Sequence, residues 1–349
     1  MEFAFSQNEC RSGFSTRESG ADMNHAINKM ATRMAAIALA ALSATSALAA
    51  EYPSKPIRMI VPFAAGGPTD TLARSLAEAM TEQLGQKVIV ENKPGVGGNV
   101  GTAQFARMSP DGYAVLLVTN GPLVANQMMF KNLGFDPKKD LDPVSFVAYL
   151  PNMVAVHPSV PAKTIKELIA LLKANPDKYS FASGGDGTST HFAGELMKSM
   201  AGVKMTHIPY KGDGASMPDV VGGQVPIVFG SIFATKRFVD GGMLRGLAVT
   251  SLDRVPSMPE MPTVAESGLP GYDLTAWYGV VVPAGTPKPI INKLSQTIAR
   301  VVASPDFRAR VEGMSGIPKS TTPEEFAAFM ESERPKWKKL IEESGIKIN

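Results

Sequence analysis

Apolar runs and amphipathic segments alternate along this chain from residue 57 onward. An apolar run at residues 57–63 leads through two glycines into a segment with one apolar face, and we expect a helix there that begins at Pro68. The same order returns later, where the run 179–183 leads through a glycine-rich segment into a predicted helix over 192–201. Strands that alternate with helices in this way favour an α/β architecture with mainly parallel strands.

Two changes of composition divide the pattern into two lobes. A polar, proline-containing stretch at residues 135–143 precedes a long apolar run, and a buried strand is expected at 277–282 after a second proline-rich stretch. We place the first crossing between the lobes in the apolar run that follows residues 135–143. The return crossing lies just before the strand expected at 277–282. Lobe 1 then comprises residues 51–151 and 274–349, and lobe 2 comprises residues 152–273. Further strands are expected at 87–91, 113–118, 205–209, 225–229 and 244–250, and further helices at 101–108, 165–174, 289–303 and 323–344.

The first 49 residues have the pattern of a secretory signal. Lys29 and Arg33 precede an uncharged stretch with an apolar centre, and Ala47-Leu48-Ala49 provides a small-residue cleavage site. Residues 1–22, ahead of this pattern, are polar, which indicates that translation truly starts further downstream than the given first residue. We therefore predict an exported, periplasmic protein whose signal peptide, within residues 1–49, is cleaved near Ala49.

Composition and motif spacing exclude several function classes. Lys and Arg number 35 against 32 Asp and Glu, and the formal net charge of +3 is too small to indicate a nucleic-acid partner. The single cysteine, Cys10, lies in the signal segment, which leaves no thiol nucleophile or disulfide afterwards. No uninterrupted apolar stretch of about 18 residues follows the signal. His157, His191 and His207 share no ligand spacing with carboxylates, so we expect no metal and no cofactor.

Each glycine loop places the beginning of a helix after the carboxyl end of a strand. The first amide hydrogens of a helix lack intrahelical partners and carry partial positive charge, which favours a carboxylate or phosphate. Ligands of open α/β sheets also lie beyond the carboxyl ends of strands. Two such helix ends that face each other would hold a dianion. Glycine-rich turns also occur without ligands, so the loops alone leave a purely structural role open.

Side chains beside the loops support a binding role. Thr69 offers a hydroxyl and an amide, whereas Asp70 either stabilises the helix start or meets an ammonium group of a ligand. The second loop is flanked by four hydroxyls, those of Ser183, Thr188, Ser189 and Thr190. Hydroxyls can donate to a carboxylate, but they also cap helices. Asn120 follows another strand, where its amide can face the same crevice.

Several longer segments are similar to those of a known family. Residues 52–70 read Tyr-Pro-Ser-Lys-Pro-Ile-Arg-Met-Ile-Val-Pro-Phe-Ala-Ala-Gly-Gly-Pro-Thr-Asp, and residues 88–99 read Val-Ile-Val-Glu-Asn-Lys-Pro-Gly-Val-Gly-Gly-Asn. Together with Pro110-Asp-Gly-Tyr113, Pro209-Tyr-Lys-Gly212 and Val282-Pro-Ala-Gly-Thr-Pro287, they closely resemble the Bug/TctC family, in the same order along the chain. That family comprises the periplasmic solute-binding receptors of tripartite tricarboxylate transporters.

The resemblance implies a type II periplasmic-binding-protein fold, in which two α/β lobes joined by crossing strands close on a ligand cleft between them. It also implies that backbone amides, hydroxyls and water hold the ligand carboxylate. The contacts carried over to this chain are Phe63, Ala64, Gly66, Gly67, Thr69 and Asp70 in lobe 1, and Ser183, Gly184, Gly187, Thr188 and Ser189 in lobe 2, with Asn120 and Tyr210 as flanks.

The sequence thus favours a non-enzymatic receptor for a small carboxylate, which can be a mono-, di- or tricarboxylate or an amino or aromatic acid. The expected partners are this organic acid and the integral membrane subunits of a tripartite tricarboxylate transporter, and we expect a monomer. Two alternatives stay open. An exported hydrolase of small esters or amides needs a nucleophile and a base, although no G-x-S-x-G motif is present. A nucleotide-dependent oxidoreductase could use residues 95–101, whose spacing departs from G-x-G-x-x-G.

Overall fold

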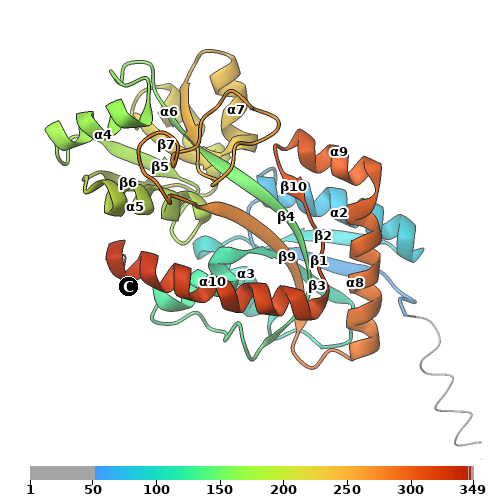
Figure 1. Ribbon diagram of the computed structural model, residues 1–349. Coiled ribbons are helices and arrows are strands. Elements are labelled where there is room, and N and C mark those ends of the chain that lie inside the picture. The colour runs from blue at the N-terminus through green and yellow to red at the C-terminus, as the bar shows by residue number, and fades with distance from the viewer. Residues whose placement is uncertain (1–51, 345, 347–349) are drawn as a thin grey trace, which may run out of the picture. The chain divides into compact units, whose positions relative to one another are not determined.

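Two long strands, β4 (Leu141–Val156) and β9 (Thr275–Pro283), run through the centre of the fold (Figure 1). They pair with each other in antiparallel register from Leu141↔Pro283 to Pro151↔Thr275. Beyond that point β4 changes partners, and residues 152–156 pair with β7 (Ile227–Ser231) and β8 (Arg245–Val249). This computed structural model describes residues 52–344 and 346, so the predicted signal peptide lies outside the described residues.

The remaining strands form two parallel groups on either side of β4 and β9. The order along the sheet is β2-β1-β3-β9-β4-β7-β5-β6. In the first half, β1 (Ile57–Val61) lies between β2 (Val88–Asn92) and β3 (Ala114–Thr119) and is parallel to both. In the second half, β5 (Ser180–Ser183) lies between β6 (Thr206–Pro209) and β7 and is parallel to both. A short strand, β10 (Ile317–Pro318), pairs with β4.

The sheet is mixed, whereas the sequence predicted mainly parallel strands. β9 is antiparallel to β3 and to β4, and β4 is antiparallel to β7 and β8. The difference arises because the two strands that join the sheet halves carry the chain in opposite directions. An apolar run identifies a buried strand but contains no information about its direction, so this feature depends on contacts distant in sequence.

Helices flank both halves of the sheet. Those associated with the first half are α2 (Pro68–Leu84), α3 (Asn99–Phe105), α8 (Lys288–Ala303) and α9 (Pro305–Gly313). Those of the second half are α4 (Ile165–Ala174), α5 (Ser189–Ala201), α6 (Asp213–Val221) and α7 (Ile232–Asp240). Three short helical turns lie in the first half: η1 (Val96–Gly98), η2 (Gly121–Ala125) and η3 (Asn126–Met128). The last helix, α10 (Pro323–Ser344), contacts β4, η2 and α5, so it packs against elements from both halves.

Local sequence accounts for where several helices begin. Pro68 is the first residue of α2, where a missing amide hydrogen costs nothing, and Gly85 ends the helix in the left-handed region at φ +67°. Thr164 caps α4 by accepting a hydrogen bond from the Glu167 amide. Thr322 and Glu325 exchange hydrogen bonds at the beginning of α10, which is the capping-box arrangement.

The described residues from Pro53 onward form one unit, and its sheet passes through both halves. The change of partners along β4 at Pro151 and Asn152 marks a natural place to divide it. We therefore keep the division into residues 51–151 with 274–349 and residues 152–273 as a proposal, and refer below to the first and second half. Within the described part of the chain, every helix is too short or too polar to cross a bilayer.

Candidate functional site

The first glycine loop joins β1 to α2, and Asp70 holds its shape. The Asp70 carboxylate is buried and accepts hydrogen bonds from the Gly66 amide at 2.9 Å, from Arg74 Nε at 3.0 Å and from Asn92 Nδ2 at 3.0 Å. Burial alone would raise the pKa of Asp70, but these bonds and the positive charge of Arg74 outweigh it and lower the pKa. Asp70 therefore braces the loop from within, in addition to stabilising the start of α2.

This bracing determines which amides of the first loop remain available. The Gly66 amide is already bonded to Asp70, so it is not free for a ligand. Within the described residues, the amides of Ala64, Ala65 and Thr69 have no protein acceptor. Ala64 and Ala65 are also exposed to solvent. These three amides lie at the beginning of a 17-residue helix, where the dipole favours an anion.

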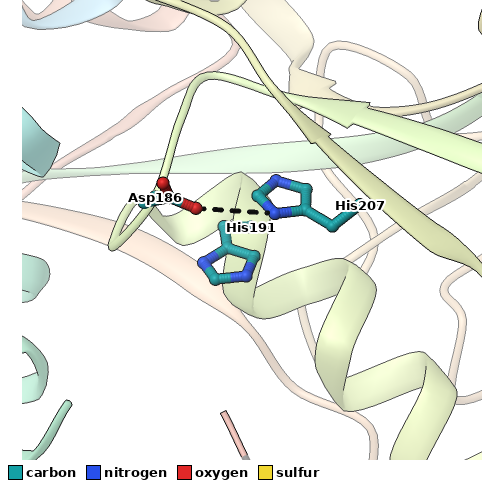
Figure 2. A group of neighbouring side chains, drawn as sticks. All are labelled: Asp186, His191 and His207. Carbon is teal, nitrogen blue, oxygen red and sulfur yellow. Dashed lines mark ion pairs between the residues drawn. The ribbon is translucent and has the colours of Figure 1, made fainter. Parts of the chain in front are cut away.

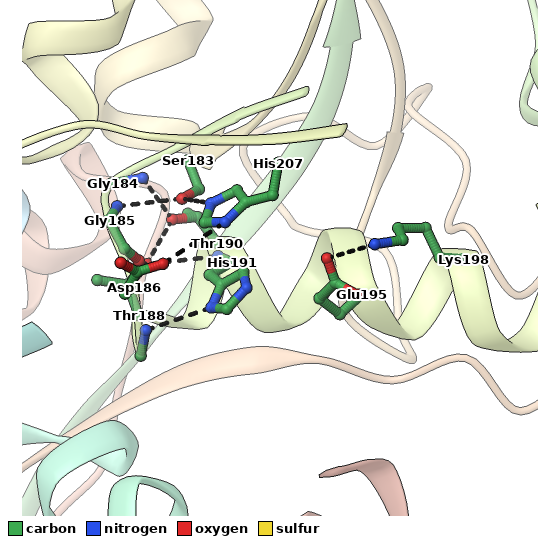
Figure 3. A network of polar contacts seen from close by, with 11 residues as sticks. Ser183, Gly184, Gly185, Asp186, Thr188, Thr190, His191, Glu195, Lys198 and His207 are labelled. Atoms are coloured by element: carbon green, nitrogen blue, oxygen red, sulfur yellow. Dashed lines mark hydrogen bonds and ion pairs between the residues drawn. The ribbon is translucent and has the colours of Figure 1, made fainter. Parts of the chain in front are cut away.

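The second glycine loop joins β5 to α5, and its polar groups bond mainly to each other (Figure 3). The Gly184 amide donates to Thr190 Oγ1 at 2.9 Å, and the Gly185 amide donates to Ser183 Oγ at 3.1 Å. The hydroxyl of Thr188 donates to the Gly185 carbonyl at 2.6 Å and accepts from the His191 amide, so it caps α5. The hydroxyls of Ser183, Thr188 and Thr190 are thus used within the loop, whereas Ser189, the first residue of α5, has no side-chain hydrogen bond among the described residues.

Two stacked histidines support the second loop from behind (Figure 2). The rings of His191 and His207 lie with centroids 4.0 Å apart and planes 12° apart, and Nδ1 of His191 accepts a hydrogen bond from the Gly187 amide at 3.3 Å. Burial, the neighbouring His207 and the charge of Lys198 lower the pKa of His191 to about 3. Burial and Lys198 lower the pKa of His207 to about 4, so both rings are neutral at neutral pH.

Asp186, His191 and His207 bring potential ligand atoms within 4.8 Å of one another, although the sequence offered no ligand spacing. A metal ion must lie close to the plane of each imidazole that binds it, because the nitrogen lone pair lies in that plane. Two nearly parallel rings stacked 4.0 Å apart have no common point that meets this requirement. The cluster is therefore a packing arrangement.

Ser183, His207 and Asp186 also resemble the order of a hydrolytic triad. Ser183 Oγ lies 2.6 Å from His207 Nε2, and Asp186 Oδ1 lies 3.6 Å from His207 Nδ1. However, Ser183 is completely buried and its hydroxyl already accepts a hydrogen bond from the Gly185 amide. A nucleophile must reach the substrate carbonyl, and this hydroxyl cannot. The 3.6 Å separation is also too long for the orienting hydrogen bond of a triad.

Tyr278 lies on β9, one of the two strands that join the halves. Its side chain is buried and hydrogen-bonded to that of Thr69, at the beginning of α2. The negative charge of Asp213, at the beginning of α6, adds to burial in raising the pKa of Tyr278. One residue on a crossing strand thus interacts with the helix start of the first half and with a carboxylate of the second half.

Backbone contacts join the second loop to the first half. A Cβ atom added at Gly97 would meet the Asp186 carbonyl, and one added at Gly121 would meet the Gly187 carbonyl. Asn126 also lies against Gly187, and its Nδ2 donates to Asn99 Oδ1 at 2.6 Å. These close approaches explain why glycine is needed on both sides of the contact.

Several fully buried polar atoms in this region have no protein partner. They are Asn99 Nδ2, Asn120 Oδ1, Asn126 Oδ1, Asn152 Nδ2 and Thr235 Oγ1. Asn120 follows β3, and its other side-chain atom, Nδ2, donates to the Thr275 carbonyl on β9 at 3.4 Å. Asn152 lies where β4 changes partners and pairs with Ser231. A buried polar group without a partner is costly, so such groups commonly mark places where water or a ligand binds.

The other predicted contacts lie at the margins of this region. The Phe63 ring packs against Gly98, and its carbonyl accepts from Asn92 Nδ2 at 3.1 Å. The Tyr210 hydroxyl donates to Asp219 Oδ2 at 2.6 Å, which together with burial raises the pKa of Tyr210 to about 12. Asp213 and Tyr278 are the residues that sequence reasoning missed. The sequence feature that could have identified Asp213 was an acidic residue at a helix start shortly after a strand. Gly212 is the N-cap of that helix.

Comparisons with known proteins identify the family and its fold. Residues 72–346 match the model of the tripartite tricarboxylate transporter family receptor, TctC. A protein encoded in the tcbD-tcbE intergenic region of Pseudomonas sp. (strain P51) is 36% identical over 299 residues, which is 85% of this chain and 89% of that protein. The structure of the periplasmic binding protein BugD is 38% identical, with a TM-score of 0.79 over 85% of this chain and 99% of BugD. R. palustris Rpa4515, solved with adipate, is 32% identical, with a TM-score of 0.82. The match covers 85% of this chain and 99% of Rpa4515.

Proposed function

The chain belongs to the TctC/Bug family of tripartite tricarboxylate transporter receptors, and we propose that it captures a small carboxylate between its two sheet halves and delivers it to a membrane transporter. It has the α/β fold of the periplasmic binding proteins in that family. It is a binding protein and not an enzyme, which removes the hydrolase and oxidoreductase alternatives considered from the sequence.

The observation that carries the proposal is the meeting of the two halves at the second glycine loop, where the Asp186 and Gly187 carbonyls lie against Gly97 and Gly121. Thr69 from the first helix start bonds to Tyr278, and Asp213 from the second half lies close enough to shift its pKa. The free amides of Ala64, Ala65 and Thr69 are donors for a carboxylate at this place. The relative solved with adipate has a similar fold and a ligand of this chemistry.

We assign ligand binding to the residues predicted from the sequence. Their contacts support different roles for different members of the set. Amides of Ala64 and Thr69 hold the carboxylate, while Gly66, Gly67 and Asp70 shape the loop that presents them. The second-half residues of the predicted set are Ser183, Gly184, Gly187, Thr188 and Ser189, which shape the opposite wall, and Phe63, Asn120 and Tyr210 flank it.

Closure of the two halves is the proposed mechanism. The ligand must interact better with the closed arrangement than with an open one, because otherwise binding cannot shift the balance between them. The exclusion of water on closure strengthens each hydrogen bond to the carboxylate. The closed form then docks on integral membrane subunits of the transporter.

We further propose that the protein acts in the periplasm as a monomer and without a nucleic-acid partner. The family match supports the compartment, and the signal pattern that ends at Ala49 supports export with cleavage near that residue. Mass spectrometry of the intact mature protein tests the cleavage site, which we expect to leave Ala50 as the first residue.

A thermal-shift experiment tests the binding function. Adipate at about 100 times its dissociation constant should add about 2.7 kcal/mol to the free energy of unfolding, which raises the melting temperature by roughly 4 °C for a chain of this length. Adipamide has the same shape without charge and should have no effect. If no mono-, di- or tricarboxylate and no amino or aromatic acid changes the melting temperature, the proposed function is wrong.

A further inference from the structure

Asp213 is a carboxylate of the second half that lies where three helices begin. It is the first residue of α6, and its Oδ2 accepts a hydrogen bond at 3.0 Å from the amide of Ser231, the N-cap residue of α7. Its Oδ1 accepts from Thr190 Oγ1, in the first turn of α5, at 3.4 Å, and also lies against Gly184. The protein's own carboxylate therefore occupies the positive region formed by these helix starts.

Asp213 lacks the counter-charge that its equivalent in the first half possesses. Asp70 forms an ion pair with Arg74, whose Nε lies 3.0 Å from the carboxylate. Among the described residues, no Lys, Arg or His forms an ion pair with Asp213, and its carboxylate accepts hydrogen bonds from Ser231 and Thr190. Burial accordingly raises the pKa of Asp213, whereas the pKa of Asp70 is lowered. A charge of this kind is stabilised by a nearby cation.

The two walls of the proposed site thus differ in electrostatic character. The first wall offers the free amides of Ala64, Ala65 and Thr69, which suit an anion. In the second wall the amides of Gly184, Gly185 and Gly187 are bonded internally, and Asp213 adds a negative charge. Asp213 Oδ1 lies against Gly184, and the same glycine loop meets the first half where the Asp186 and Gly187 carbonyls lie against Gly97 and Gly121.

We propose that Asp213 is a specificity-determining residue that selects ligands with an ammonium group opposite the carboxylate. This inference rests on the proposed function, and it narrows the substrate class to amino acids over dicarboxylates. A carboxylate held by the first wall leaves the other end of a short ligand near Asp213. A second carboxylate there is repelled, whereas an ammonium group forms a charge-assisted hydrogen bond and neutralises Asp213.

The experiment compares ligand pairs that differ only at the far end. Isothermal titration calorimetry measures the affinities of the wild type for 3-aminopropanoate against succinate, 4-aminobutyrate against glutarate, and 5-aminopentanoate against adipate. In the pair whose length fits, the amino acid should bind at least tenfold more tightly. In D213N the charge is lost and the shape is kept, so the amino acid should lose at least tenfold in affinity and the dicarboxylate should bind no worse. D240N removes an exposed acid at the end of α7 and is the matched control, with affinities like the wild type.

The outcomes separate this inference from the proposed function. If no ligand of either kind binds the wild type, the proposed function fails. If the wild type prefers the dicarboxylate in every pair, or if D213N keeps the preference for the amino acid, carboxylate capture stands and the role of Asp213 is wrong. If D213N does not fold, the comparison of ligand pairs in the wild type tests the role of Asp213 by itself.

Discussion

Acidification should destabilise this protein through the stacked histidines behind the second glycine loop. The pKa of His207 is about 4 in the folded protein, against about 6.5 in an unfolded chain. Between these values the unfolded chain binds a proton that the folded protein does not. The free energy of unfolding is therefore highest above pH 6.5 and falls as the pH falls toward 4.

The magnitude follows from the size of the pKa shift. Each pH unit below 6.5 costs about 1.4 kcal/mol for a group that stays neutral in the fold, so His207 should account for about 2 kcal/mol between pH 7.5 and pH 5.0. Its side chain is 13% exposed, so solvent screening is limited. The lowered pKa values of Asp70 and Glu91 keep both ionised over this range, and their contribution is lost only at lower pH.

The variant H207Q tests this reasoning. Glutamine does not titrate, and its amide nitrogen can still reach the hydroxyl of Ser183, which His207 Nε2 contacts at 2.6 Å. Urea unfolding at pH 7.5 and pH 5.0 should show that the loss of stability between the two pH values is about 2 kcal/mol smaller in H207Q than in the wild type.

The control S183A removes the same contact but leaves the histidine. It should be less stable than the wild type at both pH values, by about 1 kcal/mol, and should keep the wild-type pH dependence. If H207Q loses as much stability on acidification as the wild type, His207 titrates normally in the folded protein, and the burial argument is wrong.

Three substitutions test the loops and the core. D70N removes the charge that holds Arg74 and the Gly66 amide, and it should lower the free energy of unfolding by about 2 kcal/mol and weaken carboxylate binding, as urea unfolding and calorimetry measure. G121A pushes against the Gly187 carbonyl of the other half and should reduce affinity for the ligand at least tenfold without a comparable loss of stability. G279A places a methyl group against the Phe326 ring in the core and should cost about 1–3 kcal/mol of unfolding free energy.

Each substitution has a control elsewhere in the chain. D306N alters an exposed first-turn acid of α9, so an equal effect in D306N and D70N would mean that Asp70 acts only at its helix start. G313A has open space around the added methyl group in a helix, so it should leave affinity unchanged and should not lower stability. Unchanged ligand affinity in G121A would show that the contact with Gly187 is not part of the binding-competent form.

The order of elements and many helix positions could be predicted from local pattern. The helices 165–174 and 323–344 match α4 and α10, and the helix predicted to begin at Pro68 does so. Helices α6 and α7 were not expected. Helix α6 contains Gly214 and Pro218, residues that disfavour a helix, and it forms because its apolar positions Met217 and Val220 pack in the core.

The position of the glycine loops was more predictable than the hydrogen bonds within them. Glycine loops after strands indicate where a ligand binds, and the first loop has the free amides that this argument requires. The hydrogen bonds of the second loop depend on His207 and Asp213. His207 lies 24 residues from Ser183, and Asp213 lies 23 residues from Thr190. Contacts over such separations are set by the register of β5 and β6, and a single sequence does not contain that register.

The contact between the two halves indicates why a ligand should control closure. On one side it consists of Gly97 and Gly121, and on the other side of the carbonyls of Asp186 and Gly187. Glycine against a carbonyl buries little apolar surface, so this contact contributes little favourable free energy by itself. The halves can approach closely there, and on the proposed mechanism a molecule that contacts both walls adds the bonds that favour the closed arrangement at this contact. On the two proposals above, such a molecule meets free amides on one wall and Asp213 on the other, so the asymmetry proposed to select the ligand would also determine which ligands close the receptor.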